Sequence, residues 1–388
     1  MKVVQSQRLG ALPPYLFARL DELKQEALSR GVDIIDLGIG DPDLPTPAPI
    51  IERLYTAAQD PANHRYPSYV GMLAFREAVA NWFKQRYHVQ LDPKSEIVSL
   101  IGSKEGIAHI PLAFVNPGDV VLVPDPGYPV YQSSTIFAGG IPCIMPLLPE
   151  NNFLPDLDAI DKNMLAKAKL MFINYPNNPT AAIASREYLQ SVIDFAYKHN
   201  IILCQDAAYN EMGYDDYKPL SILELDGGRD VAIEFHSFSK TFNMTGWRLG
   251  FAVGNKDIVQ GLGKIKTNVD SGVFQAVQWA GIEALKHYNE FVPTFCKTFA
   301  SRSAIIIAGL QKLGFQINYS KATFYLWIRV PKGFDSTGFC LHLLDQAGII
   351  VTPGVGFGQY GEGFFRIATT VPQERLYEAL ERIRKVVL

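Results

Sequence analysis

The sequence predicts an α/β fold in which a mostly parallel sheet lies between layers of helices, followed by a smaller α+β domain. Two observations predict the first part: short, nearly continuous apolar runs recur along the chain, and helical segments separate them. Strands of this kind are buried on both faces, as in parallel sheets that helices cover on each side. The third observation is a change near residue 285 to a long helical stretch followed by short strands, which predicts the second part.

The N-terminal region, residues 1–46, is predicted to be an arm and a helix that pack with the smaller domain. Apolar residues at helical spacing predict a helix over 16–30, and Gly31 ends it. Residues 34–37 predict a short strand. The run at 38–43 predicts a loop, in which two glycines either allow a ligand to approach the backbone or simply form a tight turn.

The large domain is predicted to span residues 47–282. An amphipathic helix covers Leu73 to Tyr87, and a second helix covers 107–114. The apolar runs that predict buried strands are 96–101, 120–123, 170–173, 201–204, 231–235 and 251–254. Ligands of such sheets bind beyond the carboxyl ends of the strands. Polar residues that directly follow these runs are therefore candidates for a site.

The small domain is predicted to span residues 283–388, and it begins with a helical stretch at about 283–313. Its predicted strands are 315–317, 323–328, 349–351 and 364–368, and its later helices cover 335–347 and the chain from Pro372. A glycine-rich loop at 354–358 lies between the last two strands. This loop lacks the strand–turn–helix context of a dinucleotide-binding motif, which disfavours a nucleotide-binding protein.

Composition and charge limit the classes of function. The 388 residues have a net charge of −3 with both signs spread along the chain, which disfavours nucleic-acid binding as the main activity. The four cysteines, at 143, 204, 296 and 340, are far apart, and they predict buried thiols in a reducing compartment. No signal peptide or membrane-spanning run is found. We therefore expect a cytoplasmic protein, without a metal site.

The stretch from Ser237 to Gly250 predicts a reactive lysine on a loop between two apolar strands. A lone lysine in such a place is commonly a solvated surface residue. Here Ser237 and Ser239 lie just before Lys240, and Arg248 follows it by eight residues. Hydroxyl groups and a guanidinium are suited to binding a phosphate. A lysine beside a phosphate site can form a Schiff base with a phosphate-bearing aldehyde, and pyridoxal phosphate is the obvious candidate.

Other strand ends offer partners for such a cofactor. Ser103 and Lys104 follow Gly102 at a predicted strand-to-helix turn, which is either an anion site or an ordinary helix cap. Asp206 ends a strand and could hold a protonated pyridine nitrogen, although it could equally be a helix N-cap. Tyr209 could donate to the phenolic oxygen of the cofactor ring, or be a core tyrosine.

Three more residues complete the candidate set. Asn178 lies in an Asn-Pro loop after a strand, where its amide could bind the same phenolic oxygen or be part of a turn. Tyr128 could stack on the ring, or lie on a surface loop. Arg366 stands in an apolar strand and needs a partner, either a buried carboxylate of the protein or the α-carboxylate of a substrate.

The order of these motifs along the chain resembles that of the class I and II aminotransferases, which are fold type I pyridoxal phosphate enzymes. The resemblance covers essentially the whole chain. Ser237-Phe238-Ser239-Lys240 with Thr245-Gly246-Trp247-Arg248-Leu249-Gly250 is the most specific match. The resemblance implies transamination in two half-reactions, with Lys240 as Schiff-base lysine and proton carrier and with Asp206 and Tyr209 as further catalytic residues. It implies that the cofactor is bound by Ser103, Lys104, Tyr128, Asn178, Asp206, Tyr209, Ser237, Ser239, Lys240 and Arg248.

The resemblance also implies a homodimer with shared sites, in which Tyr66 from the neighbouring subunit completes the phosphate cup. One departure from the family pattern is clear. The usual Asn-Pro-Thr-Gly sequence ends in Ala181 here, which is expected to alter a turn and to leave Asn178 in place.

A narrower resemblance is to the bacterial LL-diaminopimelate aminotransferases of lysine biosynthesis. It rests on four stretches: residues 12–17, 37–43, 102–109 and 124–131. It implies that glutamate and tetrahydrodipicolinate are converted to 2-oxoglutarate and LL-diaminopimelate. The implied substrate-binding residues are Tyr15, Gly40, Lys104, Tyr128, Asn178, Asn268 and Arg366.

Other functions remain open at this point. Alanine, branched-chain and aromatic aminotransferases share much of the same sequence, and a pyridoxal phosphate lyase or decarboxylase on this fold would differ in needing no second keto acid. A non-catalytic sensor domain of a regulator would be expected to have a DNA-binding domain attached, for which the chain has no room.

Overall fold

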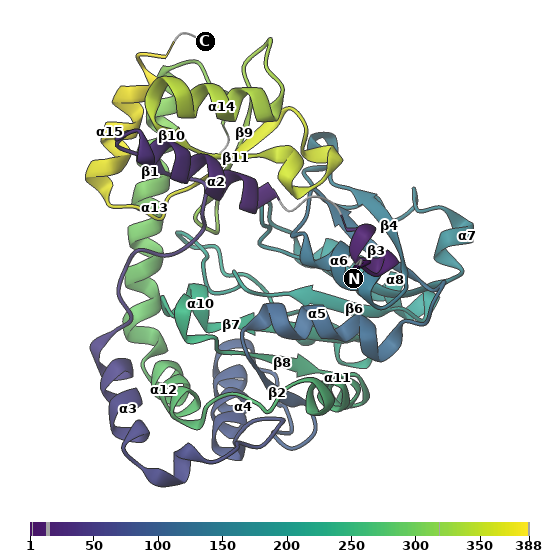
Figure 1. The fold of residues 1–388 in the computed structure, drawn as a ribbon. Helices are drawn as coiled ribbons and strands as arrows, with labels where there is room; N and C mark the ends of the chain where they lie inside the picture. Colours follow the sequence, from purple (N-terminus) through teal and green to yellow (C-terminus); the bar gives the residue numbers. More distant parts are fainter. Residues whose placement is uncertain (2, 13–15, 318, 387–388) are drawn as a thin grey trace.

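The computed structural model describes residues 1, 3–12, 16–317 and 319–386. Its centre is a seven-stranded sheet, here called the central sheet, with the strand order β2-β8-β7-β6-β5-β3-β4 (Figure 1). β8 runs antiparallel to β2 and β7, and the remaining pairs are parallel, which confirms the mostly parallel sheet. The strands are β2 (Ile97–Leu100), β3 (Val120–Asp125), β4 (Ile141–Pro146), β5 (Ala168–Ile173), β6 (Ile202–Asp206), β7 (Ala232–Ser237) and β8 (Gly250–Gly254).

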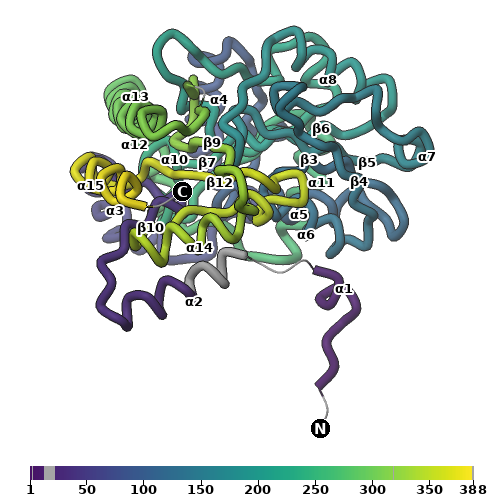
Figure 2. The backbone as a smooth tube through the Cα atoms, turned by 90° about the horizontal axis from the view of Figure 1, so that it is seen from above, coloured from purple at the N-terminus to yellow at the C-terminus, as the bar shows by residue number. Residues whose placement is uncertain are grey.

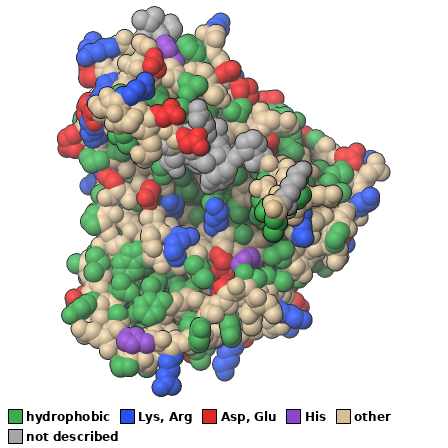
Figure 3. Space-filling model, viewed as in Figure 1, with side chains coloured by type: hydrophobic (Ala, Val, Ile, Leu, Met, Phe, Trp, Pro, Cys, Tyr) green, Lys and Arg blue, Asp and Glu red, His purple; other side chains and the backbone are tan. Residues whose placement is uncertain are grey.

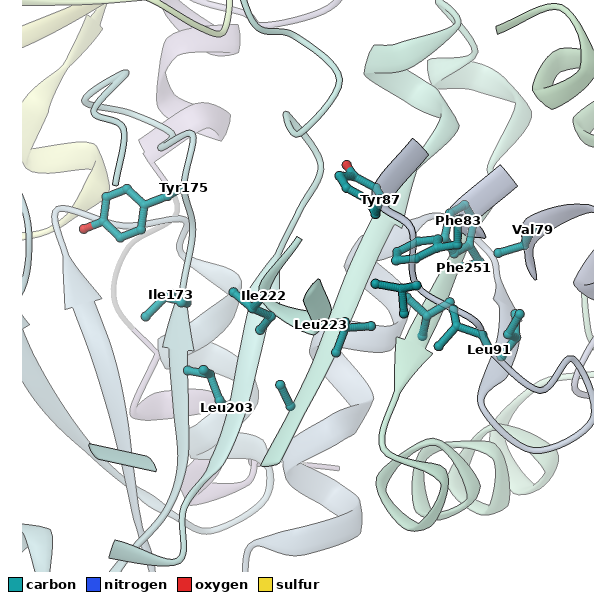
Figure 4. Packing of buried hydrophobic residues seen from close by; sticks show 14 of the residues in the cluster. Val79, Phe83, Tyr87, Leu91, Ile173, Tyr175, Leu203, Ile222, Leu223 and Phe251 are labelled. Carbon is teal, nitrogen blue, oxygen red and sulfur yellow. The ribbon is translucent and has the colours of Figure 1, made fainter. Parts of the chain in front are cut away.

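Both faces of the central sheet are buried, because successive side chains of each strand point to opposite faces. Met171 and Ile173 belong to one core cluster, and Leu170 and Phe172 belong to another. Figure 4 shows the first cluster, in which Phe251 of β8 lies beside Phe83. The helices of this part are α3 (Ala48–Ala58), α4 (Leu73–Tyr87), α5 (Ser103–Phe114), α6 (Val130–Phe137), α7 (Lys162–Leu165), α8 (Arg186–His199), α9 (Gly228–Val231), α10 (Phe238–Thr241), α11 (Lys256–Val269) and α12 (Gln275–Lys286).

The C-terminal part forms a second layer with its own core. A three-stranded antiparallel sheet, here called the C-terminal sheet, has the order β11-β12-β9, and β10 pairs in parallel with β1 from the N-terminal region. The long helix α13 runs from the level of the central sheet to the C-terminal sheet (Figure 1). The elements are β1 (Ile35–Asp36), α13 (Tyr288–Lys312), β9 (Tyr325–Arg329), α14 (Ser336–Ala347), β10 (Ile349–Ile350), β11 (Thr352–Pro353), β12 (Phe364–Ala368) and α15 (Gln373–Ile383).

The N-terminal region divides between the two parts. α2 (Leu16–Ser29) lies beside the C-terminal part in both views. α1 (Gln7–Gly10) instead lies against α6, where Arg8 donates to the carbonyl of Phe137 at 3.2 Å (Figure 2). This hydrogen bond uses a carbonyl at the end of α6, where the last carbonyls of a helix lack partners within the helix. The domain boundaries at 46/47 and 282/283 stay a prediction.

Two predicted elements differ in detail. The helix expected at about 283–313 is interrupted at His287, which ends α12 and precedes α13. The strand expected at 315–317 does not form, because its backbone has no ladder partner there, although Phe315 and Ile317 are buried in the C-terminal core. None of the helices in the described part of the chain combines the length and apolar character that crossing a membrane requires.

Candidate active site

The polar residues predicted at strand ends converge at one edge of the central sheet. Ser103 follows β2, Asn178 follows β5, Asp206 ends β6, and Lys240 follows β7. We call this group, with the loop residues that contact it, the strand-end site. Figure 3 shows lysine and arginine side chains in the hollow between the C-terminal part above and the central-sheet part below.

Lys240 lies on a one-turn helix, α10, rather than on the predicted loop. The turn forms because Ser237 caps it: its hydroxyl accepts a hydrogen bond from the backbone N–H of Ser239 at 3.2 Å. The Lys240 Nζ donates to the carbonyl of Gly40 at 2.6 Å. Burial lowers the pKa of this ammonium from its ordinary 10.5 to about 8. With a pKa of about 8, roughly a tenth of Lys240 is uncharged at pH 7, and the uncharged form is the one that acts as a nucleophile or base.

The turn before α5 has the form of a phosphate cradle. Gly102 has φ +76°, and a Cβ atom there would collide with the guanidinium of Arg248. The helix begins at Ser103, so its free N–H groups and dipole face the same place as that guanidinium. Arg248 is held by its Nη1, which donates to the carbonyl of Thr245 at 2.8 Å. These donors suit a doubly charged phosphate group.

Asp206 is buried at the end of β6. Its Oδ2 accepts a hydrogen bond from the hydroxyl of Tyr131 at 2.7 Å, and its Oδ1 accepts one from the N–H of Ala208 at 3.2 Å. Burial raises the pKa of this carboxyl to about 6, and these two hydrogen bonds oppose that rise. Burial disfavours the ionised form of this carboxyl, and a cationic partner would stabilise that form. A protonated pyridine nitrogen is such a partner.

Tyr209 and Tyr325 form a hydroxyl pair, with their oxygens 3.0 Å apart. Burial raises the pKa of Tyr209 well above its ordinary value, so it stays a protonated donor. Gly40 lies close to this pair, because a Cβ atom at position 40 would collide with the hydroxyl of Tyr325. The Gly40 loop, whose carbonyl accepts the hydrogen bond from Lys240, therefore packs directly on the tyrosine pair.

Arg366 and Asn178 meet across the two layers of the molecule. The Arg366 Nη1 donates to Oδ1 of Asn178 at 2.7 Å, and its Nη2 donates to the carbonyl of Gly38 at 2.7 Å. Only 2% of Arg366 is exposed. Both of these acceptors are neutral amide oxygens. A substrate carboxylate would add the negative charge that a buried guanidinium favours.

The Asn178 loop is held in place by the side chain of Asn174. Asn174 accepts the N–H of Asn178 on its side-chain oxygen at 2.7 Å, and its amide donates to the carbonyl of Asp206 at 2.7 Å. Asn174 thus links the Asn178 backbone to the end of β6. Ala181 adopts a left-handed backbone with φ +58°. The turn therefore accommodates an alanine in a conformation that favours glycine.

Lys104 and Tyr128 lie beside the site. The Lys104 Nζ is 5.6 Å from the centre of the Tyr128 ring. Burial, and secondarily the charge of Arg248, lower the pKa of Lys104. Both line a cavity of about 310 Å³ that extends to the loop at 355–358. Asp125 lines the same cavity and accepts the N–H groups of Gln359 and Tyr360 at 3.1 and 3.0 Å, which joins β3 to the C-terminal part.

Three predicted residues are not placed in the strand-end site. Tyr66 is 87% exposed on the surface. Asn268 is exposed near the end of α11, and its amide donates to the carbonyl of Lys264 on the same helix at 2.8 Å. Tyr15 lies outside the described residues. The roles of all three stay predictions.

Three further residues belong to the site and were not predicted: Tyr131, Asn174 and Tyr325. Tyr131 follows Tyr128 by three residues, a spacing that places both on one side of a helical turn, and this could have indicated it. Asn174 directly follows the β5 run, like the other strand-end residues. Tyr325 lies in the predicted strand at 323–328, where nothing in the sequence separates it from a core residue.

The residues present fit pyridoxal phosphate. The cradle at Gly102 has donors for its phosphate, buried Asp206 suits its ring nitrogen, and Lys240 has the lowered pKa that a reactive amine needs. Fold and site together therefore define a fold type I pyridoxal phosphate enzyme that acts on amino acids.

Comparison with known proteins identifies the family. The model of "Aminotransferase class I and II" matches residues 32–383. This chain belongs to the class I and II aminotransferases, and it depends on pyridoxal phosphate as they do.

Individual relatives agree with this assignment. The chain is 58% identical over 383 residues to "LL-diaminopimelate aminotransferase" of Aquifex aeolicus, covering 99% of each chain. It is 56% identical over 386 residues to the protein of the same name from Syntrophobacter fumaroxidans, covering 100% of each. Among solved structures, the substrate-bound BacF structure from Bacillus subtilis superposes with a TM-score of 0.97 at 39% identity, covering 100% of this chain and 99% of that one.

Proposed function

We propose that this chain is an LL-diaminopimelate aminotransferase, which transfers the amino group of glutamate to tetrahydrodipicolinate and forms LL-diaminopimelate and 2-oxoglutarate. The geometric observation that supports amino transfer is the fork of Arg366 beside Asn178, within the same site as Lys240. The choice of substrate is supported by the full-length relatives of that name.

We assign cofactor binding to the strand-end site as follows. Ser103, Ser237, Ser239 and Arg248 bind the phosphate, with Lys104 at the same turn. Asp206 binds the ring nitrogen, Asn178 and Tyr209 bind the phenolic oxygen, and Tyr128 covers the ring. Bound pyridoxal phosphate supplies the electron sink for the negative charge that develops at the α-carbon of the amino acid.

Lys240 is the acid–base group in this proposal. Its uncharged Nζ accepts the proton from the α-carbon of the amino donor, and it later returns a proton as the general acid. Its lowered pKa suits both roles. Arg366 binds the α-carboxylate through two N–H groups and so fixes the direction of the Cα–H bond, with the backbone at Gly40 and the amide of Asn178 beside it.

Lys104 is the residue we assign to the distal part of the substrate, together with Tyr15, Tyr128 and Asn268. Its partial burial beside Tyr128 makes it a cation at the side of the site. Both proposed substrates have a charged or polar group away from the reacting carbon. A lysine in this position can interact with such a group.

We also propose a homodimer in which Tyr66 enters the site of the partner subunit. Tyr66 is 87% exposed, so its side chain is accessible to a partner subunit. Figure 3 shows apolar side chains gathered on the lower left of the molecule, where α3, α4 and α12 lie. Exposed apolar residues on and near these elements are Ile51, Tyr55, Tyr69, Leu73 and Phe274.

The location of the reaction is likewise proposed as the cytoplasm. This rests on the cysteine pattern: the four cysteines are free, two of them buried and two half-buried. We also retain the division into residues 1–46, 47–282 and 283–388 as a proposal.

A half-reaction screen tests the proposed substrates. The holoenzyme is mixed with a single amino acid, and loss of the visible absorbance of the bound cofactor is followed. LL-diaminopimelate and glutamate are expected to remove the absorbance, and alanine is not. Strong loss with alanine, branched-chain or aromatic amino acids would overturn the substrate assignment. Product formation without any second keto acid would indicate a lyase instead.

A further inference from the structure

A fully buried lysine, Lys266, lies in the last turn of α11 and reaches Glu105 of α5. Lys266 has 0% exposure, and its Nζ donates to Oε2 of Glu105 at 3.1 Å and to both oxygens of Asp270 at 2.9 Å. Lysine is almost never fully buried unless it is paired, and removing one member of a buried pair leaves an uncompensated charge.

Glu105 connects Lys266 to the phosphate cradle. Its Oε2 also accepts the backbone N–H of Ile101 at 2.9 Å, and its Oε1 is 2.9 Å from Nδ1 of His109. Ile101 immediately precedes Gly102, the glycine at which the cradle turns. The Glu105 carboxylate therefore fixes the peptide that enters the turn, and Lys266 fixes the carboxylate.

Asp270 connects Lys266 to the segment that bears Tyr66. Its Oδ1 accepts the N–H of Gly272 at 2.7 Å. Gly272 has φ +86°, and a Cβ atom there would lie 2.9 Å from the carbonyl oxygen of Ser68. The loop held by Asp270 is thus packed against the backbone two residues after Tyr66. The amide of Gln275 also donates to the carbonyl of Arg65, at 3.3 Å, from the same side.

The cluster is better explained by an ammonium than by a metal. Donor atoms of Glu105, His109 and Asp270 lie within 4.8 Å of one another, a spacing that a metal ion could use. The Lys266 Nζ forms ion pairs with both carboxylates, at 3.1 and 2.9 Å, and so already occupies the position between them that a cation would take.

We propose that Lys266 is a positioning residue that couples the phosphate cradle of its own subunit to the Tyr66 segment that completes the site of the partner subunit. The link runs from Ile101 through Glu105, Lys266 and Asp270 to the loop beneath Ser68. It rests on the proposed dimer with shared sites. Each subunit's network thereby supports two cofactor sites, one through its cradle and one through its Tyr66.

Charge-neutral variants give the first test. In Glu105→Gln and Asp270→Asn the shape of each side chain is kept and its ion pair with Lys266 is lost. Apoenzyme is titrated with pyridoxal phosphate, and the dissociation constant is read from the visible absorbance of the bound cofactor. Because hydrogen bonds to charged groups contribute strongly, we expect about 10–100-fold weaker binding. Lys264→Met and Asp257→Asn, on exposed positions of α11, are the matched controls and should bind as the wild type does.

Lys266 itself is tested by rescue. Lys266→Met leaves two carboxylates without a counter-charge, so its folding is checked first by circular dichroism. Lys266→Arg keeps the positive charge and is expected to recover most of the cofactor affinity that Lys266→Met loses. If Glu105→Gln and Asp270→Asn fold normally and bind the cofactor as tightly as the controls, the proposal is wrong, whatever Lys266→Met does.

The link to the cradle and the link to the Tyr66 segment can be tested separately in a mixed dimer with a single functional site, here called the live site. One subunit has Lys240→Ala and so donates its Tyr66 without forming a reactive site. The other has Tyr66→Phe and keeps its own Lys240. Asp270→Asn is then placed in either subunit. Weaker cofactor binding at the live site is expected from both placements, because one affects the donated Tyr66 and the other affects the cradle.

The outcomes distinguish this proposal from the proposed function. A live site that responds only to Asp270→Asn in its own subunit overturns the coupling, while the dimer and the substrate assignment stand. A wild-type chain that sediments as a monomer overturns both the shared site and the coupling. A failed substrate screen with normal responses in the mixed dimer overturns the substrate assignment and supports the coupling.

Discussion

The hydroxyl of Tyr131 donates a 2.7 Å hydrogen bond to Oδ2 of Asp206, and both groups are buried. Tyr131 also stacks on Phe172, with ring centres 5.0 Å apart and planes 18° apart. The ring is therefore fixed by the core, and its hydroxyl fixes the carboxylate. The carboxylate is thus fixed in one position, and in its proposed role Asp206 would meet a cationic ring nitrogen without having to reorganise.

Tyr131→Phe should weaken cofactor binding. The change removes one hydrogen bond to a charged acceptor, a contribution of about 1.5–3 kcal/mol, so the dissociation constant of pyridoxal phosphate should rise about 10–100-fold. Titration of the apoenzyme measures it. Tyr188→Phe is the control, since it removes a 2.7 Å hydrogen bond to the carbonyl of Pro155 away from the site. Equal affinity in both variants would refute the role of Tyr131.

Lys240→Ala should abolish amino transfer and also change how the stability of the apoenzyme depends on pH. The pKa of Lys240 falls from 10.5 to about 8 on folding, so the unfolded chain binds more protons between these values. The unfolding free energy of the wild type should therefore rise from pH 8 towards pH 10, by at most about 3 kcal/mol from this group. The variant lacks this increment. Denaturant unfolding at both pH values, compared between the two proteins, checks it; parallel pH curves would contradict the shift.

Arg366→Lys should lower kcat/KM for amino donor and keto acceptor alike. A lysine cannot reproduce the fork that holds Asn178 and a carboxylate together, and losing a charged hydrogen bond of about 1.5–3 kcal/mol predicts a fall of about 10–100-fold. Steady-state kinetics with both substrates measure this. Arg329→Lys, an exposed arginine on the neighbouring strand β9, should leave both values unchanged. A loss confined to one substrate would argue against a shared carboxylate grip.

Ala181→Gly should stabilise the protein. An alanine at φ +58° has a steric cost of roughly 1–2 kcal/mol that glycine avoids, and glycine loses part of that gain through its more flexible unfolded chain. A net increase of about 0.5–1 kcal/mol in unfolding free energy is expected. Ala182→Gly next to it, without a positive φ, should be destabilising. The same sign of change in both variants would contradict the strain at Ala181.

The parts of the site that could be predicted lie where the apolar pattern ends. Ser103, Asp206 and Lys240 directly follow buried runs, and the carboxyl ends of parallel strands share one edge, so their convergence follows from the sequence. Even here the local form was missed: Lys240 lies on a helical turn because Ser237 caps it, and capping of so short a turn has no periodic signal.

The rest depends on contacts between distant segments. Tyr131 and Asp206 are 75 residues apart, and Lys266 and Glu105 are 161 residues apart. Neither pair stands out in the sequence, because a tyrosine in an apolar helix and a lysine on an amphipathic helix are ordinary residues there. The contact of α1 with α6 is of the same kind, because it includes a hydrogen bond between residues 129 positions apart.

The close approach of Gly40 to Tyr325 has a consequence for how this enzyme can vary. Any side chain at position 40 would displace the Tyr325 hydroxyl, and with it the hydroxyl of Tyr209 3.0 Å away. Gly246 differs, because a Cβ atom there would meet nothing within 4 Å among the residues that the structure describes. In a library of random single substitutions, position 40 should therefore be almost empty of active variants, while position 246, only six residues from the reactive lysine, should tolerate small side chains.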